Sequence, residues 1–143
     1  MIPKTLLFVS VSRLHPPGES EQLQAIVEQG RNRNRSLGIN ATLVAARGRF
    51  AEVLDGPEES LQTLMASIRA DPRHEQVTTV LHQDYQAARP AGSGMELVYR
   101  GESLYIARSI TPLLEATPAD RDQAALAAQL LFLIRELGKG PDD

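Results

Sequence analysis

The chain has 143 residues, enough for one domain with a single sizeable core, and its formal net charge of -3 argues against a surface that attracts nucleic acid or an anionic membrane. The absence of cysteine excludes disulfides, thiol catalysis and cysteine metal sites, and the absence of tryptophan excludes that side chain as a buried electron donor. No apolar run approaches the roughly 18 residues of a membrane-spanning helix and no secretory signal pattern opens the sequence, so a cytoplasmic location is expected.

The N-terminal part predicts a strand followed by a helix. Residues 5–12 (TLLFVSVS) form an apolar, β-branched run, and the two prolines that follow would interrupt any strand ladder. In residues 19–38, apolar side chains recur with helical spacing and acids occupy the first turns. Gly38 stands where a C-terminal helix glycine is expected.

A hairpin and a second helix are expected next. Residues 39–46 and 49–55 read as two strands, and Gly48 between them can adopt the positive φ of a tight turn. Residues 56–74 contain the clearest helical pattern. Pro57 suits the first turn, two glutamates follow it, and an apolar stripe runs along one side.

The remaining strands complete a known arrangement. Residues 75–83 alternate between apolar and polar side chains, and residues 94–99 follow a glycine-rich segment as a fifth strand. The order β-α-β-β-α-β-β predicts an α+β fold of ferredoxin-like type, with an antiparallel or mixed sheet and two helices on one face. The other face of that sheet would be left bare.

The C-terminal part predicts helices. Residues 106–114 form one, and residues 122–137 form another with apolar side chains on more than one side. This last helix can pack on the bare sheet face and still offer a surface to a protein partner or a second copy of the chain. Its expected boundaries are Thr117 as N-cap, Pro118 as first helical residue and Gly138 just past the end.

Two polar residues interrupt the apolar strand faces. Ser10 lies on the same face as Phe8, and Glu52 lies on the same face as Phe50 and Leu54. Both strands would be central, so one explanation is a cleft between the two helices that receives a polar ligand.

The alternative for Glu52 is a structural ion pair. An ionised carboxylate is costly to bury without a partner, and an arginine such as Arg35 or Arg73 could supply one. Spacing leaves the cleft and the ion pair equally open.

Other polar motifs favour structural roles. The basic cluster RNRNR (31–35) could grip phosphate, but at the end of a helix in an acidic chain it is more often compensation of the helix dipole. The histidines lack metal-ligand spacing, and no nucleophile elbow or Walker glycine loop occurs. A hydrolase of ferredoxin-like fold would lack an arranged nucleophile or base, so an enzyme is not expected.

Residues 34–74 resemble the BLUF family, the blue-light sensors that use flavin. The family pattern runs roughly I-T-G-x-L, G-x-F-x-Q-x-L-E-G-P, an apolar helix and D-x-R-H, and the spacing is kept without a gap. The match extends over about residues 5–98, so we expect a BLUF-like domain at 1–98 and a helical extension at 99–143. The resemblance implies that FAD is bound with its ring between the two helices on the sheet. The extension is similar to that of short stand-alone members, which implies a ring-shaped homo-oligomer.

The resemblance also implies a set of flavin contacts. Asn34 matches the asparagine that hydrogen-bonds the polar edge of the flavin, and Arg73 and His74 match the Arg-His near the ring and its side chain. The remaining matches are Ser10 for the strand-one serine, Met95 for the strand-five methionine, and Asn32 and Arg33 at positions where the family often has phosphate- or ribityl-facing groups.

The departures from the family fall on its photochemistry. The strand-one tyrosine is Phe8, the strand-three glutamine is Glu52, and the remaining differences are Ser93 for a frequent tryptophan and Ile39, Asn40 and Ala41 for I-T-G. In the family, light moves an electron and a proton from the tyrosine to flavin, and the glutamine amide then rearranges its hydrogen bonds. Phenylalanine has no hydroxyl to donate, and an ionised glutamate only accepts.

Two functions therefore stay open. The first is a BLUF-type flavin-binding sensor or regulator without the usual photocycle, in which Glu52 takes up a proton because its charge is repelled by the flavin edge. The second is a flavin-free interaction module in which Glu52 is tied to an arginine and the C-terminal helices build an oligomer.

Overall fold

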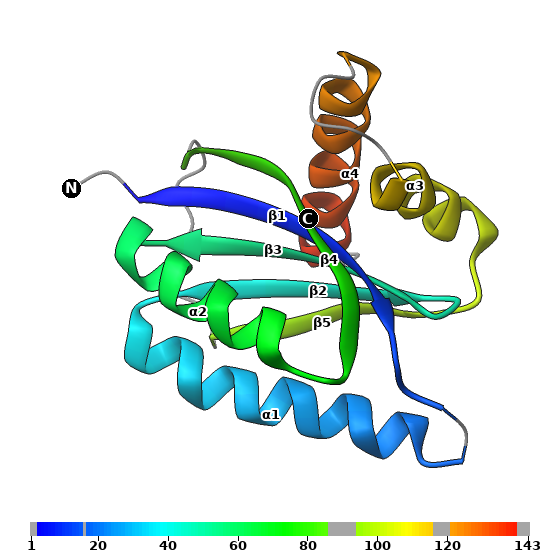
Figure 1. Cartoon of the computed structure of the whole chain (residues 1–143), viewed down its shortest axis with the longest axis horizontal. Coiled ribbons are helices and arrows are strands. Elements are labelled where there is room, and N and C mark those ends of the chain that lie inside the picture. Colours follow the sequence, from blue (N-terminus) through cyan, green and yellow to red (C-terminus); the bar gives the residue numbers. More distant parts are fainter. Residues whose placement is uncertain (1–2, 16, 86–93, 116–120, 140–143) are drawn as a thin grey trace.

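The computed structural model describes residues 3–15, 17–85, 94–115 and 121–139 (Figure 1). Its centre is a five-stranded sheet in the order β4-β1-β3-β2-β5, in which β2 and β5 are parallel and the other neighbours are antiparallel. The predicted α+β fold with a mixed sheet is confirmed. The strands are β1 (Lys4–Ser12), β2 (Asn40–Ala46), β3 (Arg49–Gly56), β4 (His74–Asp84) and β5 (Met95–Gly101).

Helices cover both faces of the sheet (Figure 1). One face carries α1 (Glu19–Leu37) and α2 (Glu58–Ala70), and the other carries α3 (Leu104–Glu115) and α4 (Arg121–Lys139). Strand side chains alternate between the two cores: Leu6 and Phe8 of β1 pack on the α1–α2 side, and Leu7 and Val9 on the α3–α4 side. The prediction that the last helix packs on the bare face is confirmed.

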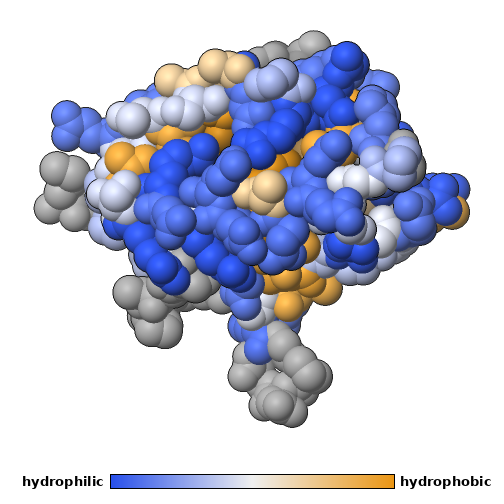
Figure 2. Space-filling model, turned by 90° about the horizontal axis from the view of Figure 1, so that it is seen from below, coloured by the Kyte–Doolittle hydropathy of each residue, from blue (hydrophilic) through white to orange (hydrophobic). Residues whose placement is uncertain are grey.

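The local geometry of α1 and the hairpin follows the sequence signals. Gly38 ends α1 at φ 72°, and its N–H donates to the Arg35 carbonyl oxygen. Arg47 and Gly48 both have positive φ, 49° and 76°, as the favoured two-residue hairpin turn requires. The outer face of α1, seen from below in Figure 2, is mostly hydrophilic, and the apolar side chains of the helix are buried in the core.

The C-terminal helices differ from expectation at their ends. The helix expected at 106–114 begins earlier, at Leu104, and the Ser103 hydroxyl accepts a hydrogen bond from the Ile106 N–H at 3.2 Å. Gly138 lies inside α4 rather than past its end. The packing of Leu133 and Leu137 against the core offsets the roughly 1 kcal/mol that a helical glycine costs. The expected caps Thr117 and Pro118, and also Ser93, lie outside the described residues.

Candidate functional site

Phe8 and Glu52 lie directly opposite each other in the centre of the sheet. They are register partners on the antiparallel strands β1 and β3, so their side chains share one face. Phe8 belongs to the core beneath α1 and α2, and Glu52 keeps only 4% of its surface exposed. A carboxyl group is therefore buried beside a phenyl ring under the two helices.

Burial dominates the electrostatics of Glu52. Loss of solvent raises the pKa of its carboxyl group to about 7, and the nearby positive charge of Arg33 opposes part of this rise. No hydrogen bond or ion pair within the described parts of the chain reaches the Glu52 side chain. The alternative of an ion pair between Glu52 and Arg35 or Arg73 is therefore wrong, because Arg73 pairs with Asp71 and, among the described residues, Arg35 forms no ion pair with Glu52.

Asn34 and Met95 meet where α1 approaches the start of β5. Asn34 is fully buried, its Nδ2 donates to the Gly94 carbonyl oxygen at 3.0 Å, and its Oδ1 accepts a longer bond of 3.4 Å from Arg33 Nε. The close approach depends on Gly30, since a Cβ there would lie 2.2 Å from Met95 Sδ. Asn34 and the buried Met95 thus lie together at the β5 end of the core between the sheet and α1.

Ser10 and His74 form a second polar pair on the same face. Ser10 Oγ lies 3.0 Å from His74 Nδ1, and the imidazole ring lies 5.0 Å from the Phe50 ring and 6.1 Å from the Phe8 ring. Burial lowers the pKa of His74 below its ordinary 6.5, against the opposing charge of Asp71. The imidazole is therefore neutral at pH 7 and can donate from one nitrogen and accept at the other.

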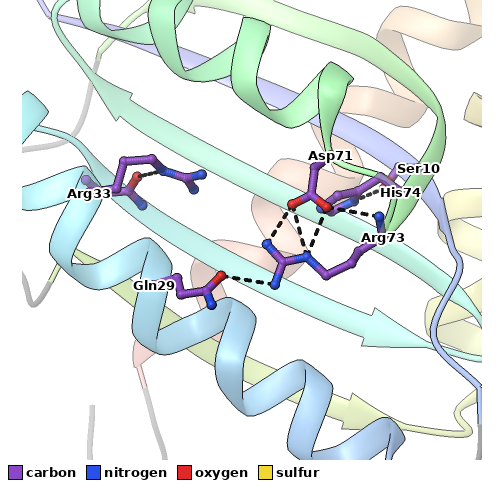
Figure 3. A network of polar contacts seen from close by, with 7 residues as sticks. Ser10, Gln29, Arg33, Asp71, Arg73 and His74 are labelled. Carbon is purple, nitrogen blue, oxygen red and sulfur yellow. Dashed lines mark hydrogen bonds and ion pairs between the residues drawn. The ribbon is translucent and has the colours of Figure 1, made fainter.

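Arg73 spans the gap between the α2–β4 turn and α1 (Figure 3). Its guanidinium forms a forked pair with Asp71, with a shortest distance of 2.7 Å, and Nη1 donates to Gln29 Oε1 at 3.1 Å. The hydrogen bonds from Arg73 hold the pKa of Asp71 below its ordinary value. The guanidinium thus ties the rim of the site to α1.

The structure brings most of the expected site residues onto one face of the sheet. Those directed into the α1–α2 side or its rim are Phe8, Ser10, Asn34, Glu52, Arg73, His74 and Met95. Asn32 differs, because its side chain is exposed on α1. Gln29 and Asp71 were missed. Gln29 lies one helical turn before Arg33, and Asp71 begins the D-x-R-H motif, so both signals were present in the sequence.

The chemistry of the group suits a planar heterocycle with a polar edge. Arg33, Asn34 and His74 offer donors, the Asn34 amide and Glu52 offer acceptors, and a protonated Glu52 becomes a donor as well. Phenyl rings supply an apolar floor. Among the described residues no side chain or backbone group bonds the buried Glu52 carboxyl group, which a polar ligand would satisfy, so the chemistry of the residues present fits a flavin ring.

The described residues contain neither a candidate metal site nor a candidate membrane-spanning helix. Among them, no group of three or more histidine, aspartate or glutamate side chains could hold a metal ion. In the same part of the chain, no helix combines the length and apolar character needed to cross a membrane.

Comparison with known proteins identifies relatives of matching sequence. The beta subunit of photoactivated adenylate cyclase from Euglena longa is 37% identical over 70 residues, which are 49% of this chain and 8% of that protein. The blue light- and temperature-regulated antirepressor BluF of Escherichia coli K12 is 32% identical over 94 residues, 65% of this chain and 23% of that protein. The chain therefore spans less than a quarter of the length of these relatives.

Solved structures share the fold. BlsA in its photo-activated state matches with a TM-score of 0.69 at 18% identity, over 99% of both chains. The dark-state structure of BlrB, a BLUF protein, matches with a TM-score of 0.63 at 22% identity, over 91% of this chain and 95% of that one. BlrP1 of Klebsiella pneumoniae, a calcium and cy-diGMP complex, matches at 29% identity and a TM-score of 0.61, over 91% of this chain and 34% of that one.

The family model for BLUF, described as sensors of blue-light using FAD, matches residues 4–95, well over half of the sequence. The chain belongs to the BLUF family of flavin-based blue-light sensor domains.

Proposed function

We propose that this chain is a flavin-binding sensor or regulatory domain that does not run the usual BLUF photocycle. The observation that carries the proposal is the opposition of Phe8 and Glu52 on β1 and β3, at the positions where the resemblance expects tyrosine and glutamine. Bound flavin would supply the blue-light absorption and the redox-active ring. Phe8 has no hydroxyl proton to give, and an ionised Glu52 has no donor to exchange.

The surrounding residues are assigned to binding and orientation. Asn34 would hydrogen-bond the polar edge of the ring, His74 and Ser10 would fix its face, and Met95 would close the end near β5. Arg73 at the rim, with the exposed Asn32, would face the ribityl and phosphate portion of FAD. These are binding roles, so the chain is proposed to signal rather than to catalyse a reaction.

Output is proposed to pass through the C-terminal helices. Leu104, Tyr105 and Phe132 are large apolar side chains with exposed fractions of 47%, 73% and 67% on α3 and α4. Surfaces of this kind on a helix pair commonly bind a protein partner. We assign this surface to a partner protein or a homo-oligomer, and we propose a cytoplasmic location for the chain.

A flavin-free interaction module is the second candidate. The observation that favours it is that polar groups expected to bind flavin are already engaged within the protein. The Asn34 amide bonds Gly94 and Arg33, and the Arg73 guanidinium bonds Asp71 and Gln29. A ligand would have to compete with these contacts.

An absorption spectrum of the purified full chain, as isolated and after addition of FAD, separates the two candidates. A flavin band that does not shift to the red under blue light supports the proposed function. Colourless protein that takes up no added FAD supports the interaction module, and a normal reversible red shift contradicts the loss of the photocycle. The Phe8→Tyr/Glu52→Gln variant is the matched test, because it restores the two family residues together and is expected to gain a red shift.

A further inference from the structure

A separate pocket lies at the tip of the β2–β3 hairpin, and we call it the hairpin pocket. Its volume is about 290 Å³. It is bounded by the end of β1, the first turns of α1, the hairpin tip and the end of β5, which meet at the right-hand end of the sheet in Figure 1. Of the residues described for the flavin site, Phe50 also lines this pocket and the polar ones do not, so the polar groups of the two sites are distinct.

Arginines dominate the charge of the hairpin pocket. Arg47 and Arg49 come from the hairpin and Arg100 from the end of β5. Arg47 is held in place, since its Nε donates to the Glu102 carbonyl oxygen at 2.7 Å and lies 3.8 Å from the Glu102 carboxylate. Arg49 donates from Nη1 to the Arg47 carbonyl oxygen at 2.7 Å. These contacts of Arg47 therefore fix the positions of Arg47 and Arg49 on the hairpin side of the pocket.

Two of these guanidinium groups still lack a counter-charge. Within the described residues, no ion pair includes Arg49 or Arg100. The two carboxylates of the lining, Glu19 and Glu102, are both on exposed residues, and Glu102 is already paired with Arg47. In a chain with a formal net charge of -3, two unpaired guanidinium groups facing one pocket form a local site for an anion.

The rest of the lining suits the two parts of a phosphorylated molecule. The first turn of α1 contributes Ser20 to the lining. No side chain of the N-cap residue Gly18 engages the backbone N–H groups at this helix end, so they can attract an anion together with the arginines. Leu14, Leu23 and Phe50 provide an apolar wall opposite. A volume of about 290 Å³ is at the small end for ligand pockets, which limits the ligand to the size of a sugar phosphate.

We propose that the hairpin pocket binds a small phosphorylated molecule, with the phosphate held between Arg49 and Arg100 and the organic part against Leu14 and Leu23. The planar fork of arginine matches phosphate oxygens in pairs. Phe50 separates this pocket from His74, whose ring lies 5.0 Å from that of Phe50. The proposal does not depend on flavin being bound.

Titration of the full chain with ribose 5-phosphate, followed by the amide NMR signals of Gly48, Gly101 and Ser20, tests this site. Saturable shifts of these signals are expected, with ribose as the uncharged probe causing none. The Arg49→Gln/Arg100→Gln variant should weaken binding at least about tenfold, since two charged hydrogen-bonding groups are lost. Arg108→Gln, at an exposed position on α3, is the matched control and should bind as the wild type does.

Three outcomes would overturn the proposal. The first is no saturable shift at the pocket signals with ribose 5-phosphate. The second is equal affinity in the double-arginine variant and the Arg108→Gln control, with circular dichroism confirming that both are folded. The third is binding of inorganic phosphate without binding of ribose 5-phosphate, which would make the pocket a site for the free ion.

Discussion

Replacing Glu52 by glutamine tests the central feature of the molecule, a buried carboxyl group that no other described residue bonds. Burial raises the pKa of Glu52 from 4.5 to about 7, so the folded protein holds this proton more tightly than the unfolded chain does. The contribution of Glu52 to stability is then most favourable below about pH 4.5 and falls as the pH rises from there to about 7, because the unfolded state gains more by ionising. Glutamine cannot ionise, so Glu52→Gln should remove this dependence.

The size of the effect follows from the pKa. A rise from 4.5 to about 7, at about 1.4 kcal/mol for each pH unit, corresponds to about 3 kcal/mol lost from the free energy of unfolding above pH 7. At pH 5 the cost is about 1 kcal/mol, because the folded carboxyl group is protonated and the unfolded one only partly ionised. For a chain of this length, the loss at high pH corresponds to about 10 °C in the melting temperature.

Thermal unfolding of wild type and Glu52→Gln at pH 5 and pH 8 measures this. The variant should gain stability over the wild type mainly at pH 8, and Glu96→Gln, at an exposed position on β5, should show no such difference between the two pH values. Comparing the two pH values cancels the cost of burying the amide itself. An advantage of Glu52→Gln that is the same at pH 5 and pH 8 would refute the burial of an ionisable, unpaired carboxyl group.

Three further predictions concern flavin and the C-terminal helix. Bound flavin should fluoresce, since Phe8 cannot act as its electron donor, and Phe8→Tyr should strongly quench that emission; unchanged emission in a flavin-loaded variant would contradict this. Flavin affinity should fall as the pH rises from 6 to 8, by up to about tenfold per unit above pH 7, and become independent of pH in Glu52→Gln; fluorescence titration checks both. Arg135→Gln should lower stability by about 2 to 3 kcal/mol in denaturant unfolding, because it leaves the largely buried Asp55 without its forked partner, whereas Arg108→Gln should change it by less than about 0.5 kcal/mol.

Strand periodicity was sufficient to assign the two polar residues Ser10 and Glu52 to a face of the sheet. Side chains alternate strictly along β1 and β3, so Ser10 and Glu52 could be assigned to faces before any pairing was known, and the structure finds both buried. The sequence was less informative about which neighbouring strands run parallel. The parallel pairing of β5 with β2 depends on the path of the connection between β4 and β5, and no local pattern specifies that path.

The charge partners of the site could not be predicted from spacing. Arg33, Arg35 and Arg73 are equivalent as sequence letters, but the rotation of α1 and the turn after α2 decide which guanidinium faces Glu52. Asp71 captures Arg73 through a local bond two residues away, and Arg33 is the cation that lowers the Glu52 pKa. Arg73 is therefore held by its sequence neighbour Asp71 and is not the cation that acts on Glu52.

The opposition of Phe8 and Glu52 explains why the two departures from the family pattern belong together. A tyrosine opposite Glu52 would place a hydroxyl against a carboxyl group, and that hydrogen bond would favour the ionised form and lower the pKa. With phenylalanine there, nothing on the facing strand supports the charge, so the carboxyl group stays neutral up to about pH 7. A neutral carboxyl group, like the amide it replaces, offers both a donor and an acceptor. Under the proposed function, Phe8 would therefore remove the redox step and also leave Glu52 in the protonation state that a flavin edge can accept.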